Sequence, residues 1–130
     1  MTQIRLVNAY KALAHLAVQT LPIKTAYAIH KLRRALAPSW EFQIAQEQAL
    51  AEKYRGQIDG GSIRFGNAND PEAVERARAY AADMSELNGM ESDYEAQPPV
   101  RVLLTDEIVL SANEIDALDG FVEFADGGDA

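Results

Sequence analysis

Two histidines are the first side chains in this sequence that could do chemistry. His15 and His30 could ligate a transition metal, but a stable site also needs further ligands and groups that orient them. The two residues fall on separate predicted helices. We therefore expect two ordinary helix histidines and no metal site.

Two acidic pairs, Asp106 with Glu107 and Glu114 with Asp116, form the second candidate group. Such carboxylates could bind a hard cation or act as a general acid and base. Their spacing lacks the Asp-rich loop with a central glycine and a closing glutamate that binds calcium. Glu114 also follows Ser111 by three residues, which is the spacing of a helix capping box. We expect structural or solvated roles for these carboxylates.

Motifs of the common enzyme classes are missing. The sequence contains no GxxxxGKS/T, GxGxxG, HExxH or GxSxG pattern. It also has no cysteine, which excludes disulfides, thiol catalysis and thiolate metal ligands. The sequence therefore predicts a protein that is not an enzyme, with no catalytic residues and no cofactor.

Four basic residues and the only tryptophan form the candidate interaction surface. On a helix, Lys24, Lys31 and Arg34 fall near one face, while Arg33 turns partly away. This cluster could bind RNA, DNA or an acidic protein, but we favour a solvated face or pairing with the acidic half of the same chain. Trp40 could anchor an interface, because tryptophan is enriched at binding hot spots. We favour a core position for it.

The charge of the chain is divided between its two halves. Residues 1–56 hold 8 Lys/Arg against 3 Asp/Glu, a net charge of +5, while residues 57–130 hold 4 against 17, a net charge of −13. The halves could fold onto each other, pair head to tail with a second copy, or meet a charged partner. The acidic balance argues against duplex binding by the whole molecule, because phosphate contacts dominate that affinity.

Length and composition predict one domain. The 130 residues, 48% apolar and 25% charged, suit a single globular unit over residues 1–125, with a disordered tail at 126–130. No apolar run approaches the roughly 20 residues that span a bilayer. We expect no signal peptide and no membrane partner, and we predict a cytoplasmic location.

Apolar spacing predicts a helical hairpin at the N-terminus. Residues 4–7 suggest a short strand, and Asn8 suggests the cap of a helix that ends near Gln19. After a turn at residues 20–21, a second helix should run from Pro22 to about residue 54. Pro38 either kinks this helix or divides it near residue 37. We favour one kinked helix, because the apolar rhythm keeps its phase across the proline.

The second half predicts a small β element and two more helices. Gly60 and Gly61 indicate a hairpin turn between residues 57–59 and 62–65. A helix should cover residues 71–87, a loop 89–99, and short strands 100–104 and 108–110. Ser111 and Glu114 then predict a capped short helix. We expect Phe121, Val122 and Phe124 to pack the segment after this helix against the rest of the protein. The whole pattern predicts a helix-dominated α+β fold.

The order of these landmarks resembles a family of small uncharacterised proteins encoded by bacteriophages and prophages, mostly of Gram-positive hosts. The resemblance rests on short motifs spread over nearly the whole chain: LPIK at 21–24, AIHKL at 28–32, EKY at 52–54, LSANEIDAL at 110–118 and FVEF at 121–124. It implies a phage or prophage origin, a place inside the bacterial host cell and a helix-dominated domain. It brings no catalytic residues. The Ala-rich stretch at 71–87 and the Pro98–Pro99 pair differ from that pattern.

These observations favour a function that depends on binding another macromolecule rather than on catalysis. We expect a phage accessory or assembly protein that binds another protein. A second copy of the same chain is one candidate partner. The alternative is a counter-defence protein whose acidic surface blocks a host nucleic-acid-binding protein. A nucleic-acid binder that uses Lys24, Lys31, Arg33 and Arg34 is the third hypothesis, opposed by the overall charge and by the few aromatic residues available for stacking on bases.

Overall fold

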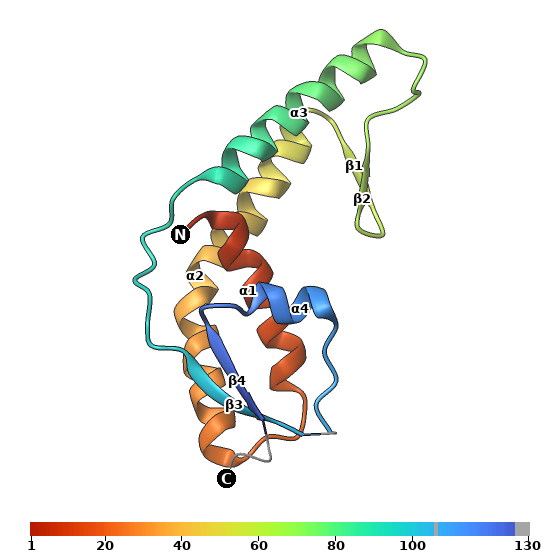
Figure 1. Cartoon of the computed structure of the whole chain (residues 1–130). Helices are drawn as coiled ribbons and strands as arrows, with labels where there is room; N and C mark the ends of the chain where they lie inside the picture. Colours follow the sequence, from red (N-terminus) through yellow and green to blue (C-terminus); the bar gives the residue numbers. More distant parts are fainter. Residues whose placement is uncertain (106, 127–130) are drawn as a thin grey trace.

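The first two helices form an antiparallel hairpin. In the computed structural model, which describes residues 1–105 and 107–126, α1 (Gln3–Ala17) and α2 (Ile23–Lys53) lie side by side and run in opposite directions (Figure 1). Leu13 and Leu16 of α1 share a buried core with Ile29 and Leu36 of α2. The predicted helix-dominated α+β fold with a helical hairpin and a long second helix is confirmed.

α1 begins near the start of the chain, earlier than predicted. The prediction of a strand at residues 4–7 is wrong: these residues are helical, and the predicted cap Asn8 lies inside the helix. Leu6, Ala9, Leu13 and Leu16 recur every three or four residues and are all buried, so residues 4–7 continue the buried face of the helix. A short apolar run does not by itself distinguish a strand from a helix.

α2 is one helix that continues through Pro38. The alternative of two helices that meet near residue 37 is therefore wrong. Proline removes one backbone N–H from the helix, but Pro38 is exposed and its neighbours keep one buried stripe on both sides of it. That stripe consists of Ile29, Leu32 and Leu36 before the proline, and of Gln43 and Ala51 after it.

The β-hairpin and the third helix follow the predicted order. β1 (Gln57–Asp59) pairs antiparallel with β2 (Ser62–Arg64), and the turn residues Gly60 and Gly61 both have positive φ, which glycine adopts without strain. α3 (Pro71–Gly89) begins at a cap in which the Asp70 carboxylate accepts from the Glu72 N–H at 3.0 Å. Figure 1 shows α3 beside the second half of α2, running back toward the hairpin of α1 and α2.

The last part of the chain forms a small parallel sheet. β3 (Val100–Leu104) and β4 (Val122–Asp126) pair in parallel with Val100 opposite Val122, and α4 (Ala112–Ala117) lies between them in the sequence. The capping box of Ser111 and Glu114 is present, as predicted. The buried Val102 and Val122 join the sheet to the core of α1 and α2.

Two predictions for this region are wrong. Residues 108–110 form no strand, because the backbone of Val109 pairs with the side chain of Gln19, in the turn after α1, rather than with another strand. Asp126, predicted as the start of a disordered tail, is the last residue of β4, and residues 127–130 of that tail lie outside the described residues. No helix in the described ranges is long and apolar enough to cross a membrane.

Candidate interaction site

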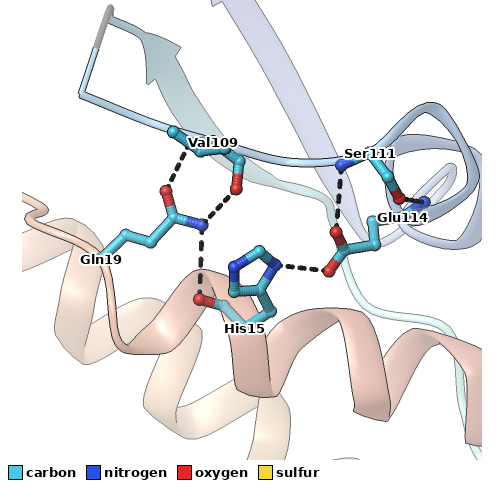
Figure 2. Close-up of polar contacts among 5 residues, drawn as sticks. All are labelled: His15, Gln19, Val109, Ser111 and Glu114. Carbon is cyan, nitrogen blue, oxygen red and sulfur yellow. Dashed lines mark hydrogen bonds and ion pairs between the residues drawn. The ribbon is translucent and has the colours of Figure 1, made fainter.

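His15 and Glu114 form a close pair of titratable side chains between α1 and α4 (Figure 2). His15 Nδ1 lies 2.6 Å from Glu114 Oε2, and Glu114 Oε1 accepts from the Ser111 N–H at 3.0 Å. The Ser111 N–H and the His15 ring both stabilise the carboxylate, so the pKa of Glu114 lies below its ordinary value. The Ser111 hydroxyl accepts from the Glu114 N–H at 3.1 Å and makes no described contact with His15. This cluster fastens α4 to α1 and lacks the nucleophile–base pair of a hydrolase.

The other predicted acidic and histidine candidates stay apart. His30 is exposed on α2, Asp116 is exposed on α4, and Glu107 is exposed between β3 and α4, while Asp106 lies outside the described residues. Among residues 1–105 and 107–126, no group of three His, Cys, Asp or Glu side chains is placed to hold a metal ion.

The predicted basic cluster divides into two groups. Lys24, Lys31 and Arg34 are exposed on the first half of α2, whereas Arg33 turns toward α1. The Arg33 guanidinium carbon lies 5.4 Å from the centre of the Tyr10 ring. Three of the four basic residues are therefore available to a partner, and Arg33 packs between the helices.

Trp40 also packs between the helices. Its ring stacks on Tyr10 with centroids 5.1 Å apart and planes 19° apart, and Lys11 Nζ lies 5.6 Å from its ring centre. Trp40 is half-buried, and its stacking on Tyr10 joins α2 to α1. Sequence reasoning did not identify Tyr10 as its neighbour.

A groove that sequence reasoning missed runs along α2. Three hollows share lining residues from one to the next, and together they extend from Ala28 to Leu50. At about 1.5 Å per residue this interval covers roughly 33 Å of helix. The opposite wall consists of the end of α3, the segment 90–99, which descends beside α2 in Figure 1, and the first residue of β3. We call these three hollows the α2 groove.

The first hollow has a volume of about 380 Å³ and mostly apolar walls. Pro98 and Val100 form one wall, and the side chains on α2 are Ala28, Lys31, Leu32 and Ala35. Lys24 lies one turn before Ala28 on the same face of the helix, so this end of the groove is basic.

The central hollow, of about 440 Å³, lies where the N-terminus meets α2. Its floor on α2 is made of Ala35, Pro38, Ser39 and Phe42. The segment opposite is held in place by the chain start: the Gln3 N–H donates to the Met90 carbonyl at 2.8 Å, and the N-terminal ammonium pairs with Glu91 at 2.6 Å.

The third hollow, of about 370 Å³, lies between α2 and α3 and shares Phe42 and Met90 with the central one. Its α3 wall carries Asp83 and Glu86. The Tyr54 hydroxyl donates to Asp83 at 2.5 Å and, with Lys53 nearby, holds the pKa of Asp83 below its ordinary value. Glu86 has no hydrogen bond or ion pair within the described part of the chain.

Charge therefore changes sign along the α2 groove. Lys24 and Lys31 lie at one end, and Asp83 and Glu86 lie at the other, with the half-exposed Phe42 between them. The central hollow also carries Glu91 and Asp93, and Glu91 pairs with the N-terminal ammonium. Comparisons with protein-family models, with curated proteins and with solved structures find no match to this chain. Function is therefore inferred from the chemistry of this groove.

Proposed function

We propose that this protein acts without catalysis, by protein–protein contact through the α2 groove. The observation that supports this most is the exposure of two large apolar side chains at the groove, Phe42 at 43% and Met90 at 46%. Apolar side chains that flank a hollow and are rimmed by charges are typical of binding surfaces. We propose an assembly or accessory role for this contact, in the phage or prophage setting that the resemblance implies.

The counter-defence alternative has less support from the described surface. Acidic side chains on α3 are interleaved with arginines, and Arg78 pairs with Glu75 at 3.2 Å. A surface that imitates nucleic acid needs an uninterrupted row of negative charge, because phosphates carry the recognition. The α2 groove offers apolar contacts in addition to charge, which suits a protein partner better.

Site-specific photo-crosslinking tests the proposed function. A benzophenone amino acid at Phe42 should give a covalent adduct with a protein in the native host, because this position lies in the groove. The same label at Val74 is the matched control: Val74 is 40% exposed on α3 and lines none of the three hollows. Absence of an adduct at position 42, or equal adducts at both positions, would contradict the proposal.

A further inference from the structure

We infer that the protein bound in the α2 groove is a second copy of this chain, arranged antiparallel about a twofold axis near residues 35–39. This inference rests on the proposed function and names the partner of the same site. Two independent properties of the groove point to it: an exposed aromatic side chain at the level of a hollow of the second copy, and opposite charges at its two ends.

The exposed aromatic side chain is Phe42, of which 43% is accessible. When two copies of α2 lie antiparallel about an axis near residue 37, positions whose numbers add to about 74 lie at the same level. Phe42 of one copy then lies at the level of Leu32 of the other, where the first hollow offers about 380 Å³ between Ala28, Ala35 and Pro98. Symmetry repeats this contact, so two phenylalanines fill two hollows.

The charges match in the same arrangement. Lys31 of one copy lies at the level of residue 43 of the other, and Lys24 at the level of residue 50, beside the hollow that Asp83 and Glu86 line. Glu86 has no described partner in its own chain, so its carboxylate is available to a lysine of the second copy. Opposite charges therefore meet at both ends of the interface.

A parallel arrangement of the two helices would not bring opposite charges together. It would place Lys24 and Lys31 beside their own copies at one end, and Glu86 beside its own copy at the other. Like charges that face each other across an interface are unfavourable. Near the axis, the antiparallel arrangement brings the exposed Ala35 and Pro38 of the two copies together, and these short side chains let the two helices approach to about 8–10 Å.

Disulfide trapping tests this geometry directly, because the natural chain contains no cysteine. Ala35→Cys places one thiol near the twofold axis, and its oxidation should give a covalent species of twice 14.3 kDa. Ala82→Cys is the control, since Ala82 is exposed on α3 and lies outside the three hollows. Trapping that is no faster at position 35 than at position 82 would overturn the inference.

Sedimentation equilibrium measures the effect of each contact on the dimer. Phe42→Ala should weaken the dimer at least tenfold, and circular dichroism checks that this half-exposed position has not unfolded the chain. Lys24→Glu and Glu86→Lys should each weaken it several-fold, and the double variant should recover affinity, because Lys24 lies at the level of the hollow that Glu86 lines and the exchanged charges still meet across the interface. Failure of the double variant to recover would count against the antiparallel arrangement.

The failure of this inference is distinguishable from the failure of the proposed function. The natural chain should sediment as a dimer at micromolar concentration and dissociate as salt is raised to 1 M, because screening weakens exposed charge contacts. A monomer at about 100 μM would overturn the inference. In that case, a photo-adduct at Phe42 with a different protein would leave the proposed function standing, and no adduct would remove both.

Discussion

The side-chain amide of Gln19 forms two hydrogen bonds with the backbone of Val109, 90 residues later in the chain. Gln19 Oε1 accepts from the Val109 N–H at 2.6 Å, and Gln19 Nε2 donates to the Val109 carbonyl at 2.8 Å (Figure 2). The amide takes the place of a neighbouring strand for this one residue. It thereby ties the segment after β3 to the turn that joins α1 and α2.

Replacement of this amide should destabilise the protein measurably. Gln19→Leu removes both bonds and is expected to lower the free energy of unfolding by about 1–2 kcal/mol, the net value of one or two partly exposed hydrogen bonds. Urea unfolding measures the change. Gln48→Leu is the control, because Gln48 is exposed on α2 without a described hydrogen bond, and an equal loss in both variants would contradict the role of Gln19.

The Glu114 carboxylate should make stability depend on pH. Its pKa is lowered in the folded state by the Ser111 N–H and by His15, so the folded protein binds this proton less readily than the unfolded chain. Its contribution is therefore fully present above the ordinary value of 4.5 and is lost as pH falls through the folded pKa. Glu114→Gln should be less stable than the natural chain at pH 7, and the difference should shrink toward zero as pH falls through the folded pKa. A difference that stays constant from pH 7 into this acid range would contradict the assignment.

The buried amide of Gln43 should tolerate an apolar replacement and reject a charge. Gln43 is 0% exposed, donates to Asn88 at 2.9 Å, and has a buried Oε1 without a described partner. Gln43→Met fills a similar volume and should change the free energy of unfolding by less than about 1.5 kcal/mol. Gln43→Glu places a buried carboxylate beside Glu47 and should cost about 2–4 kcal/mol at pH 7. Thermal unfolding of both variants compares them, and equal stability would contradict the burial of this position.

Pro38 should make the folded protein less stable than an alanine at the same position would. Pro38→Ala supplies the missing N–H of α2 and is expected to raise the free energy of unfolding by about 1–3 kcal/mol. The reverse change at an exposed helical position, Ala45→Pro, should lower it by about 3 kcal/mol. Guanidinium unfolding measures both, and a loss of stability in Pro38→Ala would show that the proline is matched to its surroundings.

Local patterns predicted the elements whose causes are local. The row from Ile29 to Leu36 and beyond predicted α2 through the proline, and the glycine pair at 60–61 predicted the hairpin of β1 and β2. Ser111 and Glu114 predicted the start of α4. In each case the residues that give the signal belong to the predicted turn or helix itself. No contact with a distant segment is needed to identify it.

Contacts between distant segments could not be predicted in the same way. The parallel pairing of Val100 with Val122 depends on the path of the chain through α4, and neither strand shows its partner in its own sequence. Gln43 was not assigned to the core because its amide is polar, although it is fully buried between α2 and α3.

The candidate site was predicted only in part. The helix spacing of Lys24, Lys31 and Arg34 correctly placed them near one exposed side of α2. The α2 groove beside them requires the segment 90–99 as its second wall, and that segment has no periodic pattern. Phe42 was missed because it falls outside the buried apolar row.

The stacked rings of Tyr10 and Trp40 provide the last prediction, a coupling between the first two helices. Their centroids lie 5.1 Å apart, a distance at which aromatic pairs contribute about 0.5–1.5 kcal/mol beyond their buried area. A double-mutant cycle with Tyr10→Leu and Trp40→Leu should return a coupling of that size. The cycle of Tyr27→Leu with Trp40→Leu is the control, because Tyr27 is 62% exposed and has no described contact with Trp40, so its coupling should be near zero.

Trp40 is the only tryptophan, and its fluorescence should shift to longer wavelength in Tyr10→Leu as its ring loses a neighbour that excludes water. Equal coupling in the two cycles would show that the stacking contributes no specific energy, and that burial alone holds Trp40 against α1.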